Sequence, residues 1–269
     1  MIIYSATLDV PVETATLVTD LLIAERRRRG TGVGSRAASA RTQALLVLRW
    51  FREDTGMPTL ARDAGVSTAT GYRYLHEGID VLAAAAPDLR EVLEAGQAAG
   101  WTHVVLDGTL IRTDRCRTKN PDTGHDLWFS GKHKAHGGNV QIVSDPDGHP
   151  VAVSDVEPGS THDLAAARAT GFLGALHAAA ALLGLPALAD KGYHGAGIGI
   201  HTPTKGANLA PSGACRNQLL TRLRAEGERG IALLKTRWKA LRRIRLGPQR
   251  IGAIVAAALV LTTAERPIR

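Results

Sequence analysis

Three acidic residues stand at positions where a carboxylate is costly unless it has a function. Asp107 ends the apolar run of THVVLDGT, Asp190 ends a second run in LPALADKGYHG, and Glu228 lies in the basic helical stretch TRLRAEGERGIALLKTRWKALRR. An aspartate at the tip of a buried strand gains no packing there, and desolvating its charge costs free energy. We therefore predict that the three carboxylates converge into a cluster that binds divalent metal.

Such a cluster serves phosphodiester chemistry. Mg²⁺ is a hard cation that prefers carboxylate oxygens and keeps several waters. Two such ions, roughly 3.5–4 Å apart, activate a water or a 3′ hydroxyl and stabilise the leaving oxygen. Spacing alone is weak evidence, because a chain of this size offers many acidic trios. For each acid the alternative interpretation is a capping or surface carboxylate.

The neighbours of Glu228 favour the metal interpretation. Arg224 lies four residues before it and Lys235 seven residues after it, so all three share one face of a helix. An acid between two cations suits a metal bound to a phosphate backbone, and a plain row of ion pairs is the alternative. Glu226 is a competing candidate on another side of the helix, and Gly227 is expected to weaken the helix locally.

Positive charge is concentrated in two stripes. The net charge is +8 and the pI is about 9.9. Residues 25–52 hold eight arginines and one glutamate, and residues 222–250 hold ten lysines and arginines and two glutamates. Such stripes indicate a nucleic acid or an anionic membrane surface as partner, with solvated helix faces as the alternative. The predicted DNA contacts within them are Arg26, Arg27, Arg28 and Arg29, on a basic loop or arm over 25–40, and Arg224, Lys235, Arg237, Arg242 and Arg243.

The segment 42–82 has the pattern of a helix-turn-helix. A helix over 42–51 precedes a short helix that starts at Leu60 and stops at Gly65, and Ser67 can cap the next helix. The second helix of such a motif fits a major groove, so Thr70, Arg73 and Tyr74 near its start are predicted to be exposed and to contact DNA. An ordinary helical hairpin is the alternative.

The second part of the chain reads as mixed α/β. Strands are predicted over 102–113, 139–145 and 149–157, then one or two helices, short strands at LPALAD and over 198–203, and helices over 213–245 and 248–264. This order suits a ribonuclease H-like sheet in which the first three strands form a meander and the fourth is parallel to the first. Asp107 and Asp190 would then be neighbours. Lys132 and Lys134 are expected to alternate on one strand face and to lean towards DNA.

We therefore predict an all-α domain over 1–90, followed by a catalytic domain with flanking helices over 100–269. Cys116 and Cys215 match no metal or redox spacing, which favours a reduced, cytosolic protein, associated with the nucleoid if it binds DNA. The start of the chain lacks the pattern of a signal peptide. The longest apolar run, over 251–262, is too short to span a bilayer, so no membrane partner is expected.

An ordered set of motifs carries a family resemblance. The strings VVLDGT, SGKHKAHGGNVQIVSDPDGHPV, EPGSTHDL, LADKGYHG, TPTKG and NQLLTRLRAEGERGIALLKTRWKAL occur in that order. Together they resemble a bacterial DDE transposase of the insertion-sequence family-five group, which is related to Harbinger-type transposases. The resemblance covers roughly 40–245, and it assigns the catalytic and metal-binding acids to Asp107, Asp190 and Glu228.

The resemblance implies a reaction and its partners. It implies Mg²⁺, or Mn²⁺ as an alternative, as a pair of ions, and cleavage of double-stranded DNA at terminal inverted repeats followed by strand transfer into target DNA. It also implies a homo-oligomer on DNA. Two alternatives stay open, namely a sequence-specific DNA-binding regulator derived from a transposase and a metal-dependent endonuclease without strand transfer.

Overall fold

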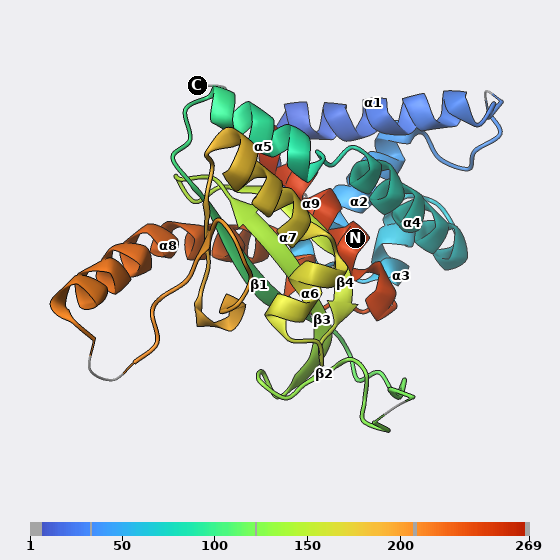
Figure 1. The fold of residues 1–269 in the computed structure, drawn as a ribbon. Coiled ribbons are helices and arrows are strands. Elements are labelled where there is room, and N and C mark those ends of the chain that lie inside the picture. The colour runs from blue at the N-terminus through green and yellow to red at the C-terminus, as the bar shows by residue number, and fades with distance from the viewer. Residues whose placement is uncertain (1–6, 33, 122, 207–208, 267–269) are drawn as a thin grey trace.

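The computed structural model describes residues 7–32, 34–121, 123–206 and 209–266. Five helices come first: α1 (Val12–Arg28), α2 (Ala40–Glu53), α3 (Met57–Asp63), α4 (Thr68–Ala84) and α5 (Leu89–Ala98). Helices α1 to α4 gather on one side of the molecule, and the sheet occupies its centre (Figure 1).

The sheet has the order that the sequence predicts. Strand β1 (Val104–Arg112) pairs antiparallel with β3 (Ala135–Ser144), which pairs antiparallel with β4 (Pro150–Pro158). On the other side of β1, β5 (Ala187–Leu188) runs parallel to it, and β6 (Ile200–His201) runs parallel to β5. A two-residue strand that the sequence did not predict, β2 (Phe129–Ser130), also pairs with β3. The predicted meander and the parallel fourth strand are both confirmed.

Helices cover both faces of the sheet. One core cluster joins α5 and the pair α6 (Asp163–Ala169) and α7 (Phe172–Ala178) to the face of β1 that carries Val104 and Leu106. The other cluster joins α8 (Pro211–Arg237) and α9 (Ile251–Ala264) to the face that carries Ile111. Because side chains alternate along a strand, Asp107 lies on the second face, with α8. The first half of α8 projects away from the body of the molecule (Figure 1).

The N-terminal helices share the core of that second face. Residues of α4 such as Leu75 and Ile79 belong to the same buried cluster as Ile254 and Leu261 of α9. The division into domains over 1–90 and 100–269 stays a prediction. Within the described residues, no single helix is long and apolar enough to cross a bilayer, and the segments Asp163–Ala169 and Phe172–Leu183 meet that test only together, with a bend of 78°.

Two predicted segments differ from the structure. The predicted helix over 213–245 is wrong in its second part, because α8 ends at Arg237 and Trp238 turns into the core with no exposure. The indole Nε1 of Trp238 donates to Thr262 Oγ1 at 2.8 Å, and a short 3-10 helix, η3 (Lys239–Arg242), follows. The predicted loop or arm over 25–40 is also wrong at its start, because α1 continues through Arg28, where the arginines complement the negative end of the helix dipole.

Candidate active site

Asp107 and Asp190 lie where the parallel strands β1 and β5 part. The pairing runs Val104 to Ala187 and Val105 to Leu188, after which β5 stops while β1 continues. The sequence suggested that Asp107 is at the tip of the strand. In the structure it lies inside β1. Asp190 follows β5 and caps the 3-10 helix η2 (Lys191–Tyr193), since its Oδ1 accepts from the Gly192 amide at 2.7 Å.

The charge of Asp190 acts on the carboxylate of Asp107. Burial raises the pKa of Asp107 to about 6, the nearby Arg224 guanidinium opposes the shift, and the charge of Asp190 adds to it. A smaller part of the rise in the pKa of Asp107 comes from a further acid, Asp163. The carboxylate of Asp107 is thus costly to ionise chiefly because it is buried, and a divalent cation bound to oxygen ligands would stabilise its charged form.

Helix α8 lies along the same face of β1 as Asp107. Gly227 is buried, and a methyl group there would come within 2.4 Å of Val105 Cγ1. Two turns later Lys235 Nζ donates to Thr109 Oγ1 at 2.7 Å and to the Leu110 carbonyl at 3.3 Å. Since Val105 and Thr109 flank Asp107 on one face of β1, α8 passes over that face. Gly227, expected only to weaken the helix, is what lets the helix approach the strand.

Glu228 is close in sequence to this contact, but its carboxylate is not in the acid cluster. Its side chain is 67% exposed and lies 4.0 Å from Arg224 Nη2. Among the described residues no three His, Cys, Asp or Glu side chains are placed to hold a metal ion, so Asp107, Asp190 and Glu228 do not form a closed trio. The competing Glu226 pairs with Arg229 at 2.5 Å.

The structure adds an acid that the sequence did not single out. Asp163, the first residue of α6, is 8% exposed, and its Oδ1 accepts from Asn139 Nδ2 at 2.8 Å. Its Oδ2 accepts from Lys132 Nζ at 3.0 Å. A methyl group at Gly108, next to Asp107, would lie 2.7 Å from Asp163 Oδ1. The available signal was an aspartate at the start of a helix just after a strand, in the string EPGSTHDL.

Several predicted DNA contacts are already engaged within the protein. Tyr74 is wrong as an exposed residue, because it faces the core at 3% exposure and its hydroxyl accepts from the Ala38 amide at 3.1 Å. Thr70 is half-buried and Arg73 is exposed, so these two remain available, and Tyr72 is the exposed aromatic of α4. The cap that Ser67 provides to the Thr70 amide is confirmed, at 3.2 Å.

The lysines before β3 are not on a strand. Residues 131–134 form a turn between β2 and β3, and Lys134 closes it with a φ of 49°. The predicted alternation of Lys132 and Lys134 along one strand face is therefore wrong. Lys134 is exposed, whereas Lys132 is held by Asp163.

The two basic stripes contain both paired and free cations. Arg237 is tied to Asp9 at 2.8 Å and to Glu265 at 2.6 Å, Arg243 to Asp114 at 2.7 Å, and Arg28 to Glu25 at 2.7 Å. Arg26 donates to Gln43 at 2.8 Å, and Arg29 pairs with Glu25. Arg27 and Arg242 are exposed and, within the described part of the chain, have no ion-pair partner. The stripes are thus not uniform tracks of free charge.

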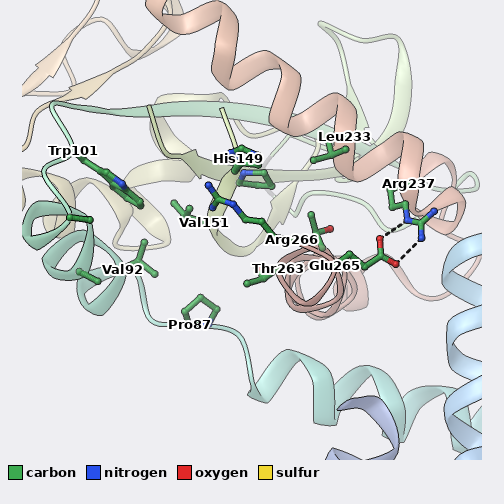
Figure 2. A pocket seen from close by; sticks show the side chains of 15 residues that line it. Pro87, Val92, Trp101, His149, Val151, Leu233, Arg237, Thr263, Glu265 and Arg266 are labelled. Atoms are coloured by element: carbon green, nitrogen blue, oxygen red, sulfur yellow. Dashed lines mark hydrogen bonds and ion pairs between the residues drawn. The ribbon is translucent and has the colours of Figure 1, made fainter. Parts of the chain in front are cut away.

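A separate cavity lies away from the acids. It encloses about 530 Å³ between α5, α8, α9 and the start of β4, and Trp101, Val92 and Leu233 form much of its apolar wall. The ion pair of Arg237 with Glu265 lies at one end (Figure 2). Of the described residues that line it, none is Asp107, Asp190 or Glu228.

Two aspartates lie where the interior strands β1 and β5 part, and paired carboxylates of this kind suit a divalent metal ion in phosphodiester chemistry. The comparison with family models supports this chemistry, because residues 106–263 match the model of the DDE superfamily endonucleases. The chain belongs to this family, whose members use divalent metal ions. Comparison with curated proteins and with solved structures gave no match in either case.

Proposed function

We propose that this protein is a DDE transposase of ribonuclease H-like fold, in which Asp107, Asp190 and Glu228 are the catalytic, metal-binding acids. The observation that carries the proposal is the pair of aspartates where β1 and β5 part, with the pKa of Asp107 raised by burial and by the charge of Asp190. The position of α8 supports the third residue, since Glu228 follows Gly227 directly, and Gly227 contacts the same face of β1.

The donor set fits Mg²⁺ or Mn²⁺, because all three side chains offer carboxylate oxygens. Asp107 and Asp190 would hold the metal from the sheet, and Glu228 would complete the site once its exposed side chain turns towards them. Bound as a pair, such ions activate a hydroxyl nucleophile and stabilise the leaving oxygen of a phosphodiester. The protein's own residues then have to hold the DNA backbone at the point where β1 and β5 part.

Arg224 is the best-supported phosphate ligand. Its side chain is 13% exposed, it lies near enough to Asp107 to lower the pKa of that carboxyl, and its Nε has no hydrogen-bond partner among the described residues. A guanidinium beside the acids suits a phosphate oxygen, because charge-assisted pairs of this kind are strong. We further propose that Arg73 and Thr70 at the exposed start of α4 read the element's end, in a helix-turn-helix with α3, and that Arg27, Arg242 and Lys134 contact the backbone.

The proposed substrate is double-stranded DNA that carries terminal inverted repeats, bound by a homo-oligomer in the cytoplasm at the nucleoid. The test is nicking of a labelled duplex that carries short inverted repeats found in the DNA flanking the gene, with Mg²⁺ or Mn²⁺. Asp107→Ala, Asp190→Ala and Glu228→Ala are each expected to abolish cleavage while DNA binding, followed by fluorescence anisotropy, stays within about twofold. Glu226→Ala is the matched control and should keep most activity.

The products separate the alternatives. Joined products with a target plasmid support strand transfer, whereas cleavage without joining supports a plain endonuclease. Sequence-specific binding with no cleavage by the wild-type chain supports a regulator. Near wild-type cleavage by any one of the three alanine variants would remove that residue from the catalytic set.

A further inference from the structure

A continuous chain of buried side chains lies on the face of β1 opposite to Asp107. The Tyr193 hydroxyl donates to Gln141 Oε1 at 2.5 Å, and Gln141 Nε2 donates to Asn139 Oδ1 at 2.9 Å. Asn139 Nδ2 donates to Asp163 Oδ1, whose carboxylate also accepts from Lys132. All four residues are buried: Tyr193 and Gln141 are 0% exposed, Asn139 is 6% exposed and Asp163 is 8% exposed. Buried polar groups are expensive unless they are satisfied, so such a chain is a costly feature for a core.

The backbone is arranged to let this chain form. Asn139 and Gln141 are two residues apart on β3, so both point to the same face, and Gln141 is opposite Gly108 in the register of β1 and β3. A methyl group at Gly108 would lie 2.8 Å from the Tyr193 hydroxyl and 2.7 Å from Asp163 Oδ1. The absence of a side chain in the residue after Asp107 therefore makes room for the two ends of the chain to meet beneath it.

One end of the chain is fixed to the turn that carries Asp190. Tyr193 closes η2, the helical turn that Asp190 caps, and its own amide donates to the Asp190 carbonyl at 3.2 Å. The turn is also close to Asp163, since a methyl group at Gly192 would lie 3.6 Å from Asp163 Oδ2. Strand β5 ends two residues before Asp190, so few backbone hydrogen bonds of the sheet hold the turn in place.

We propose that Tyr193, Gln141, Asn139 and Asp163 form a positioning network that holds the Asp190 turn against β1, so that Asp190 and Asp107 can bind the same metal ion. None of these four residues is assigned to touch the metal or the DNA. The effect on metal binding rests on the function proposed above. The rigidity of the turn does not rest on it.

The experiment uses the full chain and two readouts that do not need DNA cleavage. Hydrogen exchange of the backbone amides over 187–197 reports the rigidity of the turn. The concentration of Mn²⁺ that gives half of the metal-induced rise in Tm reports metal binding. Tyr193→Phe removes only the hydroxyl. Thr262→Val is the control, because it removes a partly buried hydrogen bond, from Trp238 Nε1, on the far side of the sheet from the network.

For Tyr193→Phe we expect clearly faster exchange in the turn and a Mn²⁺ midpoint raised on the order of 10-fold, the usual scale for groups that orient a metal ligand. Thr262→Val should change neither. Gly108→Ala should reproduce both effects of Tyr193→Phe, because the added methyl group displaces both ends of the network. Unchanged exchange in Tyr193→Phe overturns the network.

An osmolyte separates positioning from general stability. Trimethylamine N-oxide, which is excluded from the protein surface, should raise the Tm of Tyr193→Phe without restoring the hydrogen bond that the hydroxyl made, and the Mn²⁺ midpoint is compared with that of wild type in the same osmolyte. If the network positions the turn, the Mn²⁺ midpoint stays raised although stability recovers. Recovery of the midpoint together with Tm overturns the inference. The proposed function fails separately, if Mn²⁺ gives wild type and Asp107→Ala the same rise in Tm; faster exchange in Tyr193→Phe would still support the holding of the turn.

Discussion

The two sides of the candidate site are built in different ways. The sheet side holds Asp107 inside β1 and Asp190 in a turn tied down by backbone and side-chain hydrogen bonds. The helix side offers Glu228, whose side chain is 67% exposed and whose nearest cation, Arg224, is 4.0 Å away. The sheet side is thus held by contacts within the protein, while the helix side presents its carboxylate to solvent.

This difference follows from how each side chain is held. A strand fixes the direction of every side chain through its pleat and its hydrogen bonds to neighbours. A helix of 27 residues fixes its own backbone, but a long glutamate on its outer face keeps several rotamers. What α8 does fix is its distance to β1, through Gly227 and Lys235. On the helix side, therefore, the backbone is fixed relative to β1, whereas the side chain of Glu228 is free to change rotamer.

The sharpest way to break the comparison is to remove the helical acid. Glu228→Ala should lower metal-dependent cleavage by roughly 10³-fold or more, because a lost metal ligand forfeits several kcal/mol of transition-state stabilisation. Single-turnover nicking assays with Glu226→Ala as the control measure it. Strong cleavage by Glu228→Ala would mean that the sheet side holds the metal without α8.

On the sheet side, the buried charge of Asp107 should lower the stability of the metal-free protein. Burial holds the pKa of Asp107 at about 6 in the fold, above its ordinary value of 3.8. Between these values the folded state binds the proton better than the unfolded state, so the free energy of unfolding falls as pH rises from about 4 to 6. Asp107→Asn should then stabilise the protein by up to ~3 kcal/mol at pH 8, and by less at pH 4.5.

Urea unfolding in EDTA at the two pH values checks this prediction. Glu228→Gln is the control, because the glutamate is exposed and its removal should change stability little at either pH. An equal gain for Asp107→Asn at pH 8 and pH 4.5 would contradict the role of its charge.

The approach of α8 to β1 can be tested on its own. Gly227→Val adds atoms where a single methyl group would already come within 2.4 Å of Val105 Cγ1. We expect a loss of about 1–3 kcal/mol in stability from overpacking, and slower cleavage because Glu228 moves away from the aspartates. Val105→Ala in the Gly227→Val background should restore part of both. If Val105→Ala restored neither stability nor cleavage, the contact between Gly227 and Val105 would be contradicted.

The smallest expected effects concern the cations beyond α8. Arg242 is exposed, whereas Arg237 is held by Asp9 and Glu265. Arg242→Ser should flatten the slope of log K against log salt by roughly 0.9 if the residue neutralises one phosphate. Arg237→Ser should leave the slope unchanged and lower Tm. Anisotropy titrations over a range of salt decide, and a change of slope for Arg237→Ser would return that residue to the DNA interface.

Sequence reasoning was reliable where a residue's surroundings follow from local pattern. Alternation of apolar and β-branched residues predicted β1, β3 and β4 to within a few residues, and the cap at Ser67 predicted the start of α4. It failed where the burial or the hydrogen bonds of a side chain depend on a partner far along the chain. Tyr74 is buried by the Ala38 segment, and Trp238 ends α8 by packing into the core. Asp163 went unnoticed because its partners lie far along the chain, Asn139 on β3 and Lys132 in the turn before it.

The sequence by itself determined the acids at the ends of apolar runs, the order of the strands and the excess of positive charge. Each of these is a property of residue types and their spacing. Only the tertiary structure decided which charges are free, because an arginine such as Arg237 is neutralised by residues 28 and 228 positions away, Glu265 and Asp9. Only the tertiary structure decided that Gly108 and Gly227 must be small, since the groups that approach them come from α6, η2 and β1. Close approach between elements distant in sequence is set by packing, which no local pattern encodes.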